Sequence, residues 1–283
     1  MRRAATSLET ARFGDLRSTS LESLKALLAR AGGALNRAAA GYVHQKNALV
    51  ACSSRPVVSF TFDDAPRSAG VTGGAILKAA GAAGTYYVCG ALSQLGNGGY
   101  LSTNELEDLN ARGHEIACHT YSHPKLPDLT TDELRAEIDR NAAFLKHCCG
   151  DVGPYNFSYP YGAVSPGAKR VAGKYYSSCR GTSHGINTGT LDLSLLKAVR
   201  IYENRTKLED IEKWFDKLCE TKGWLIFYTH DVGNSPSAFG TSIRLFESCV
   251  VGARRRNFHI LTVRDAMNTI VRVPLGSTSS GEK

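Results

Sequence analysis

The chain has 283 residues, of which 42% are hydrophobic and 21% are charged, and its formal net charge is +8 at pH 7. This composition excludes a largely disordered chain, and no run approaches the roughly 18 consecutive apolar residues that span a bilayer, so we expect no transmembrane segment. Residues 1–50 hold eight Lys and Arg against three Asp and Glu, so most of the excess positive charge lies in this segment. Because the rest of the chain carries little net charge, we expect no nucleic-acid partner.

The cysteines and the start of the chain indicate a compartment. Eight cysteines in a chain of this length do not indicate a disulfide scaffold, and the sequence contains no C-x-x-C pair. The first twenty residues lack the apolar core of a secretory leader. We therefore predict a cytoplasmic protein.

Residues 1–50 are predicted to form a helical extension, because an Ala- and Leu-rich segment runs from residue 20 to residue 40. From residue 56 onward, short apolar strands alternate with helices. One of these helices, residues 132–147, follows the capping-box pair Thr130 and Glu133. Residues 273–283 are predicted to be a disordered tail. The predicted strands cover residues 57–62, 85–89, 114–118, 155–159, 176–179, 197–201, 224–229 and 259–263.

Seven or eight strand–helix units in one domain, residues 51–272, predict a parallel α/β sheet, and this number is what a closed (β/α) barrel needs. A doubly wound open sheet is the second interpretation. In a barrel, functional side chains collect just after the C-terminal ends of the strands. Titratable or turn-forming residues follow five of the predicted strands, and we expect them to share one rim: Asp63 and Asp64, His119 and His123, Tyr161 and Gly162, Arg180, and His230 and Asp231.

Asp63 and Asp64 are adjacent carboxylates after an apolar strand. Their repulsion favours a cation that one of them ligates, although one of the pair could instead cap the following helix. His119 and His123 are four residues apart, so both imidazoles can reach one ion together with Asp64. Two imidazoles and a carboxylate leave positions for water and substrate, as a catalytic site requires. The same three residues could hold iron for oxygen chemistry, but the free Asp63 and the distant His230 favour hydrolysis.

Four segments in this order and spacing resemble the polysaccharide deacetylase family, which carries the NodB-homology domain and is also called carbohydrate esterase family four. They are FTFDDAP (60–66), HTYSH (119–123), FSYPYG (157–162) and FYTHD (227–231). The resemblance covers roughly residues 56–270. It implies a distorted α/β barrel and a metal-dependent hydrolase that removes N-acetyl, or other N-acyl, groups from amino sugars of oligo- or polysaccharides.

The resemblance also implies a metal and its ligands. The metal is expected to be Zn²⁺, with Co²⁺, Ni²⁺ or Mn²⁺ as alternatives, and it would polarise the amide carbonyl and activate a water. Its implied ligands are Asp64, His119 and His123. An N-acetylated carbohydrate is the implied substrate.

The remaining roles follow from the same motifs. Asp63 is implied to be the general base and His230 the general acid that protonates the departing sugar amine. The backbone N–H of Tyr161 is expected to stabilise the tetrahedral oxyanion. We also predict that Pro160, Tyr161 and Tyr228 contact the substrate.

Several positions depart from the family pattern. Ser158 stands where the third motif normally carries an Arg that orients the base, and Arg180, at the end of the next strand, is predicted to supply this cation. The fourth motif, an Asp–Trp pair, is not recognisable, and Asp192 could fill part of its role. Tyr228 replaces an acyl-facing Leu, and Ala65 replaces a turn Gly. These departures support an alternative, a sugar-binding member of the same fold with weakened catalysis.

Overall fold

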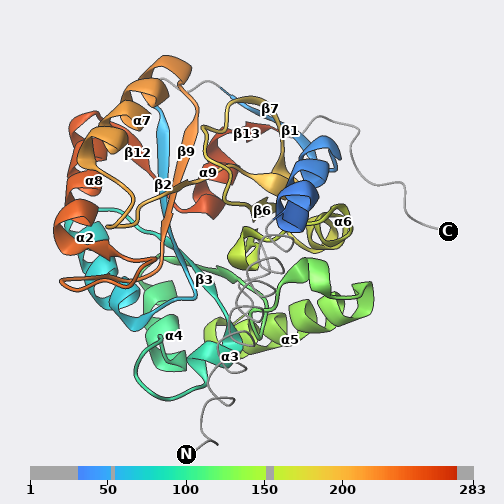
Figure 1. Ribbon diagram of the computed structural model, residues 1–283. Coiled ribbons are helices and arrows are strands. Elements are labelled where there is room, and N and C mark those ends of the chain that lie inside the picture. Colours follow the sequence, from blue (N-terminus) through green and yellow to red (C-terminus); the bar gives the residue numbers. More distant parts are fainter. Residues whose placement is uncertain (1–30, 52–54, 151–155, 273–283) are drawn as a thin grey trace, which may run out of the picture.

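The computed structural model describes residues 31–51, 55–150 and 156–272 (Figure 1). The predicted tail, residues 273–283, and most of the predicted helical segment at residues 20–40 lie outside the described residues. A parallel sheet of eight strands forms the centre of the molecule and curls into a half-barrel, which confirms the predicted fold class. The order of hydrogen-bonded strands is β6 (Ser178–Arg180), β5 (Asn156–Ser158), β4 (Glu115–Cys118), β3 (Thr85–Val88), β2 (Val57–Asp63), β9 (Trp224–Thr229) and β8 (Val199–Arg200), and β12 (His259–Ile260) also pairs with β2.

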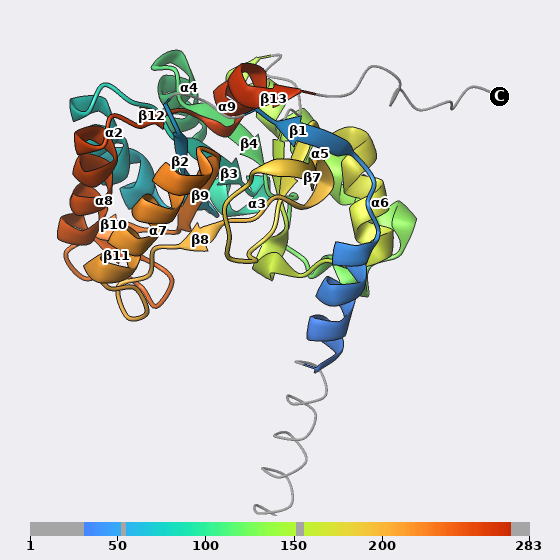
Figure 2. The ribbon, with the colours of Figure 1, turned by 90° about the horizontal axis from the view of Figure 1, so that it is seen from above.

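Helices follow the strands and cover the outer face of the sheet, as the views from the front and from above show (Figures 1 and 2). The predicted capping box is present, because the side chain of Thr130 accepts from the backbone N–H of Glu133 and the side chain of Glu133 accepts from the backbone N–H of Thr130. In the parts of the chain that the structure describes, none of the helices has both the length and the apolarity that a membrane span requires. The helices are α2 (Gly74–Ala79), α3 (Gly90–Ser93), α4 (Thr103–Ala111), α5 (Thr131–Cys149), α6 (Pro166–Tyr175), α7 (Leu208–Thr221), α8 (Ile243–Arg255) and α9 (Val263–Ile270), with short helical turns η1 (Ala69–Gly73), η2 (Leu126–Asp128), η3 (Pro160–Gly162) and η4 (Leu193–Leu195).

Strand β2 is buried along its whole length, and its alternating side chains divide the core. Phe60 and Phe62 face the helices, where Phe60 contacts Phe246 edge-on with 5.4 Å between ring centroids. Ser59 points to the opposite face and accepts a hydrogen bond from the indole of Trp224 at 2.9 Å. Because successive side chains alternate, Asp63 belongs to the same inner face as Ser59, and it reaches the rim where β2 ends.

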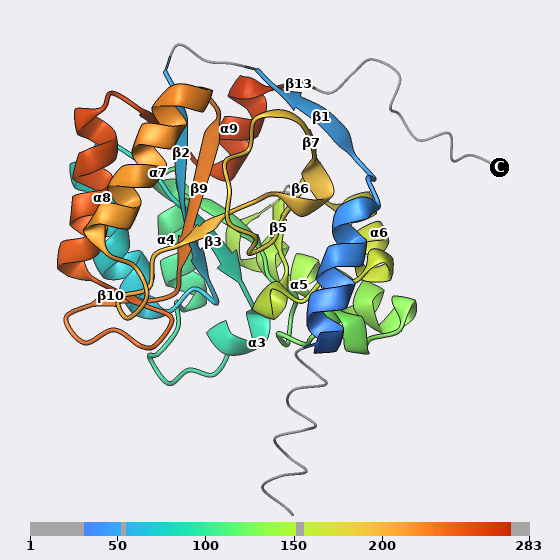
Figure 3. The same cartoon turned by 45° about the horizontal axis from the view of Figure 1, so that its top comes forward.

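A second, three-stranded antiparallel sheet holds the segment before the barrel (Figure 3). In it, β1 (Asn47–Val50) lies between β7 (Gly189–Asp192) and β13 (Val271–Arg272). Residues 31–42 are helical and lie beside α6, from which the buried Lys169 ammonium donates to the carbonyl oxygens of Ala40 and Val43, each at 2.7 Å. Residues 40–50 therefore pack on the barrel, and the division of the chain at residue 50 stays a prediction. A short parallel pair, β10 (Val232–Gly233) and β11 (Thr241–Ser242), follows β9.

Candidate active site

A cavity of about 310 Å³ opens at the C-terminal ends of the strands, where the barrel interpretation places function. Seven of the nine predicted site residues line it, and they come from four strand ends, those of β2, β4, β5 and β9. Two predicted residues do not line it: Arg180 is fully buried against Asp63, and Pro160 is buried. The lining residues are Asp63, Asp64, His119, His123, Tyr161, Gly162, Thr182, Tyr202, Tyr228, His230 and Phe239.

Asp64, His119 and His123 form a cluster that could hold a metal ion, because one ligand atom from each lies within 4.8 Å of the others. The Asp64 Oδ1 atom is 3.6 Å from Nε2 of His119 and 3.2 Å from Nε2 of His123. The Nδ1 atom of His119 donates to the carbonyl oxygen of Ser158 at 2.7 Å, which leaves the Nε2 lone pair directed at the cluster. This donor set fits a divalent ion of the zinc type.

The loops that carry these residues have an unusual backbone. Asp64, Ala65, Thr120, His123 and Tyr161 have φ between 50° and 64°, and they are five of the seven described non-glycine residues with positive φ. Each left-handed residue other than glycine costs on the order of 1–2 kcal/mol. Such strain persists where surrounding contacts fix it, and it gathers at functional sites. The site is therefore built on bends that the packing of the barrel enforces.

One acidic side chain outside the cavity holds the loop that follows β4. Glu137 of α5 accepts from the backbone N–H groups of Tyr121 at 3.0 Å and Ser122 at 2.8 Å, and from the Ser122 hydroxyl at 2.8 Å. These three hydrogen bonds fix the bend between His119 and His123. Sequence analysis missed Glu137, which is half-buried in the structure, because nothing in the helix pattern of α5 separates it from the exposed acidic residues of that helix.

Burial sets the protonation of the cluster. Burial lowers the pKa of His119 to about 3 and also lowers the pKa of His123, so both imidazoles are neutral at pH 7 with lone pairs available. Burial raises the pKa of Asp64 to about 6, and the neighbouring Asp63 acts in the same direction while His230 opposes it. At neutral pH the cluster therefore offers two neutral nitrogens and a carboxylate.

We expect Zn²⁺ to bind about tenfold more weakly at pH 5 than at pH 7. Above a pKa of about 6, Asp64 is ionised and can ligate, whereas below it the metal must displace a proton. His119 adds little to this dependence, because it stays neutral down to about pH 3. Isothermal titration calorimetry at several pH values measures the effect. The control is Asp64→Asn, which should bind weakly without this step, and equal affinity of the parent at both pH values would contradict the assignment.

Arg180, from the end of β6, lies against the second carboxylate. Its guanidinium forms an ion pair with Asp63 and donates to the hydroxyl of Ser158, the residue that replaces the motif arginine. The rings of Tyr87 and Tyr228 flank the guanidinium carbon at 5.1 and 4.8 Å from their centroids. Burial alone would raise the pKa of Asp63, but Arg180 first, then the nearby histidines, outweigh it and lower the pKa to about 2. Arg180 thus lies where the replacement hypothesis needs it, and its effect on a reaction stays a prediction.

His230 follows β9, and its Nε2 atom is 3.8 Å from Asp64 Oδ2. Its Nδ1 atom is buried and has no hydrogen-bond partner among the described residues. Two aromatic rings pack on its imidazole: Phe239 at 5.5 Å and Tyr202 at 6.0 Å between ring centroids. Tyr202 comes two residues after β8, so the rim rule applied to the strand predicted at 197–201 would have found it; Phe239 lies in a loop that no pattern marked.

Asp192 does not line the active-site cavity, which overturns the suggestion that it fills part of the role of the missing fourth motif. Its carboxylate forms a 2.8 Å ion pair with the buried ammonium of Lys169. It also accepts from the backbone N–H groups of Gln45, Lys46 and Ser194 at 2.7–2.9 Å. Every one of these partners belongs to the junction between α6, β7 and the segment before β1, so Asp192 fastens that segment to the barrel.

Comparisons with known proteins agree with the motifs. Residues 51–176 match the sequence model of the polysaccharide deacetylase family. The chain is 32% identical over 119 residues to a chitooligosaccharide deacetylase of Azorhizobium caulinodans, covering 41% of this chain and 53% of that protein. It is 34% identical over 117 residues to a peptidoglycan-N-acetylglucosamine deacetylase of Listeria monocytogenes, covering 41% of this chain and 23% of that protein.

The chain spans between 13% and 53% of the length of the curated relatives it matches. Among solved structures, a family 4 acetyl xylan esterase from Clostridium thermocellum superposes with a TM-score of 0.55 at 18% identity, covering 75% of this chain and 90% of that one, which shows a shared fold. The four motifs, the half-barrel and these matches lead to one conclusion: residues 51–176 carry the sequence pattern of the polysaccharide deacetylase family.

Proposed function

We propose that this chain is a metal-dependent hydrolase that removes N-acetyl, or other N-acyl, groups from amino sugars of oligo- or polysaccharides. One observation carries the proposal: the Asp64–His119–His123 cluster shares a cavity with Asp63, a second carboxylate that is not part of the cluster. A metal site that only stabilises the fold has no need for an ionised carboxylate beside it. The relatives named above are deacetylases of N-acetylated carbohydrates, which supports the same reading.

The cluster would hold Zn²⁺, with Co²⁺, Ni²⁺ or Mn²⁺ as alternatives. A divalent ion there would polarise the acyl carbonyl and make a water molecule more acidic. The solved acetyl xylan esterase structure contains a cobalt ion, which supports a site of this general kind. Oxygen chemistry on iron would use similar ligands, but the ion pair of Asp63 with Arg180 supports proton transfer from water instead.

The residues around the cluster supply the acid and the base. Asp63 would accept the proton of the attacking water, and Arg180 would keep its carboxylate ionised and oriented. The tetrahedral oxyanion would receive a hydrogen bond from the backbone N–H of Tyr161, a residue that lines the cavity in a left-handed conformation. His230 would then donate a proton to the sugar nitrogen as the C–N bond breaks. The products are a free amino sugar and a carboxylate, acetate in the simplest case.

A sugar-binding protein with weakened catalysis is the second candidate, and two observations favour it. The third-motif arginine is absent, with Ser158 in its place. The Nδ1 atom of His230 has no partner in the described residues, so nothing there fixes the tautomer or raises the basicity of the proposed acid. This candidate predicts binding of N-acetylated oligosaccharides without release of acetate.

The test is acetate release from a panel of N-acetylated oligosaccharides, measured beside the metal content of the purified chain. We expect release that a chelator abolishes and that added Zn²⁺ or Co²⁺ restores. His119→Ala is the control, because it should lose both the metal and the restored activity. Acetate release that resists the chelator would refute metal dependence, and a chain loaded with metal that binds the oligosaccharides but releases no acetate would establish the second candidate.

A further inference from the structure

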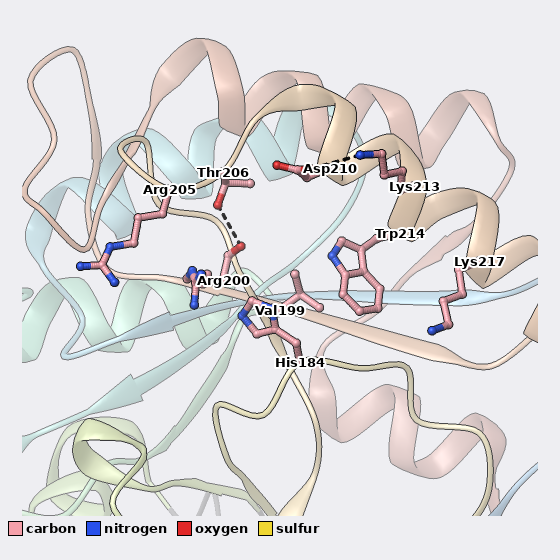
Figure 4. A pocket seen from close by; sticks show the side chains of 9 residues that line it. All are labelled: His184, Val199, Arg200, Arg205, Thr206, Asp210, Lys213, Trp214 and Lys217. Atoms are coloured by element: carbon pink, nitrogen blue, oxygen red, sulfur yellow. Dashed lines mark hydrogen bonds and ion pairs between the residues drawn. The ribbon is translucent and has the colours of Figure 1, made fainter. Parts of the chain in front are cut away.

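A second cavity, of about 450 Å³, lies under α7 beside β8, the strand that ends the sheet (Figure 4). We name it the Trp214 cavity. Figure 4 shows Arg200 and Arg205 at one end, Lys217 at the other, and the indole of Trp214 between them. It is concave and larger than the candidate active site, so it can take a group of the size of a sugar ring. The residues that matter here are Arg200, Arg205, Asp210, Lys213, Trp214 and Lys217.

The Trp214 cavity carries an unbalanced positive charge. Four cationic side chains line it, against the single carboxylate of Asp210, which lies 3.6 Å from the Lys213 ammonium. Arg200, Arg205 and Lys217 have no carboxylate partner among the described residues, and the buried Nε atom of Arg200 has no hydrogen-bond partner there. Like charges gathered in a concave site repel each other and attract an anion. A planar guanidinium with a free N–H suits an oxyanion in particular.

Trp214 adds an apolar surface to these charges. Its indole is half-buried, with the Lys217 ammonium 5.5 Å from the ring centroid and the imidazole of His184 edge-on at 6.3 Å. The face of an indole packs against the C–H face of a pyranose, while nearby cations bind an acidic group on the same sugar. A bare inorganic anion would make no use of the ring. An anionic sugar uses both the cations and the ring, so the cavity suits it better than a neutral sugar or a bare anion.

The Trp214 cavity adjoins the candidate active site through one strand. Arg200 pairs in register with Tyr228 across β8 and β9, and Tyr228 lines the active-site cavity. Tyr202, two residues after Arg200, lines that cavity as well. Burial lowers the pKa of His184, and the charge of Arg200 adds to this effect. Burial raises the pKa of Tyr228, and the same Arg200 charge opposes that rise. A carbohydrate that occupies one cavity is thus close to the charges of the other.

We infer that the Trp214 cavity binds an oxyanion group, a phosphate or a carboxylate, carried by a sugar of the carbohydrate that this protein acts on. The inference deepens the proposed function and rests on it only for the statement that the bound sugar belongs to the substrate. It names the substrate class as acidic amino-sugar glycans rather than neutral ones. The anion would take the free N–H groups of Arg200 and Arg205, and the ring would pack on Trp214.

Binding of small probes tests this inference without any catalysis. The probes are N-acetylglucosamine 6-phosphate, N-acetylmuramic acid, neutral N-acetylglucosamine and inorganic phosphate. The chain has two tryptophans, and Trp224 is fully buried, so quenching of tryptophan fluorescence reports on Trp214. We expect at least one acidic sugar to bind tenfold or more tightly than both the neutral sugar and inorganic phosphate. Comparing the first two probes tells a phosphate site from a carboxylate site.

Charge-removing variants locate the binding. Arg205→Gln combined with Lys217→Gln should raise the Kd of the acidic sugar at least tenfold in calorimetry. The matched control, Lys78→Gln with Arg255→Gln, removes the same charge from exposed positions outside the cavity and should leave that Kd unchanged. Equal Kd values for acidic and neutral sugars, or equal weakening in both double variants, would overturn the inference.

Acetate release separates this inference from the proposed function. The ratio of kcat/KM for an acidic to a neutral N-acetylated oligosaccharide should fall at least tenfold in the Arg205→Gln, Lys217→Gln variant. A chain that binds the acidic sugar as described but releases acetate from no carbohydrate would refute the proposed function and leave the anion site standing. A chain that releases acetate, but prefers acidic carbohydrates neither as substrates nor in binding, would refute the anion site and leave the proposed function standing.

Discussion

Replacing Asp63 with asparagine is expected to lower kcat for acetate release by a factor of about 10²–10⁴, the range that a positioned general base contributes. Asparagine has the same shape but no carboxylate to accept the proton of the attacking water. Metal should remain bound, because the ligand cluster consists of Asp64, His119 and His123 and does not include Asp63. A discontinuous acetate assay and metal analysis of the same samples measure both quantities.

Asp64→Asn is the matched control, since it makes the same chemical change one residue further along. It should lose both the metal and the activity, whereas Asp63→Asn should lose only the activity. Equal kcat in Asp63→Asn and the parent would remove Asp63 from the role of base. The same pair of variants also tests the sugar-binding candidate, which predicts no acetate release from the parent and unchanged oligosaccharide affinity in Asp63→Asn.

Replacing Arg180 with methionine should destabilise the fold by about 3–5 kcal/mol, because it leaves one buried charge without its partner. Asp63 is 5% exposed and Arg180 is fully buried, so little water can compensate for the loss. Without Arg180, burial would raise the pKa of Asp63 and the base would stay protonated to higher pH. We therefore also expect lower kcat and an acid limb of the pH–rate profile that moves upward, with bound metal unchanged. Chemical denaturation and pH-dependent kinetics measure these effects.

Combining Arg180→Met with Asp63→Asn is the control for stability. The double variant contains no unpaired buried charge, so most of the lost free energy of unfolding should return while activity stays low. Arg180→Lys should recover part of the activity, since it restores a cation without the planar fork. A purely structural role for Arg180 predicts lower stability with an unshifted pH profile, and that result would exclude it as the residue that positions the base.

Much of the site could be predicted because strand ends are local features of the sequence. Apolar runs locate the strands, and the residues that follow them, such as Asp64, His119 and His230, meet at one rim by the geometry of a parallel barrel. The motif departure at Ser158 also pointed to Arg180, because a buried base needs a cation and the next strand ends in one. The first of these inferences uses only the order of the elements, and the second also uses the family's third motif.

Contacts between distant loops and helices could not be predicted in this way. Asp192 shows the difficulty: it is the last residue of β7, a strand that was not predicted, and its partners are Lys169 and the backbone before β1, which no periodic pattern connects to it. Phe239 reaches His230 from a loop after β10. Glu137 holds the β4 loop from a helix whose acidic residues all look alike. Such contacts depend on the exact path of irregular segments, which side-chain periodicity does not encode.

The small antiparallel sheet has a consequence for how the molecule opens. Its middle strand, β1, lies near the start of the described chain, and one of its neighbours, β13, is the final described element. Neither end can peel away without breaking the hydrogen bonds of the other, so fraying at one end is energetically linked to fraying at the other. Lys169 of α6 and Asp192 of β7 also bind the segment before β1. The first and last described strands therefore hold each other, and this segment, on the barrel.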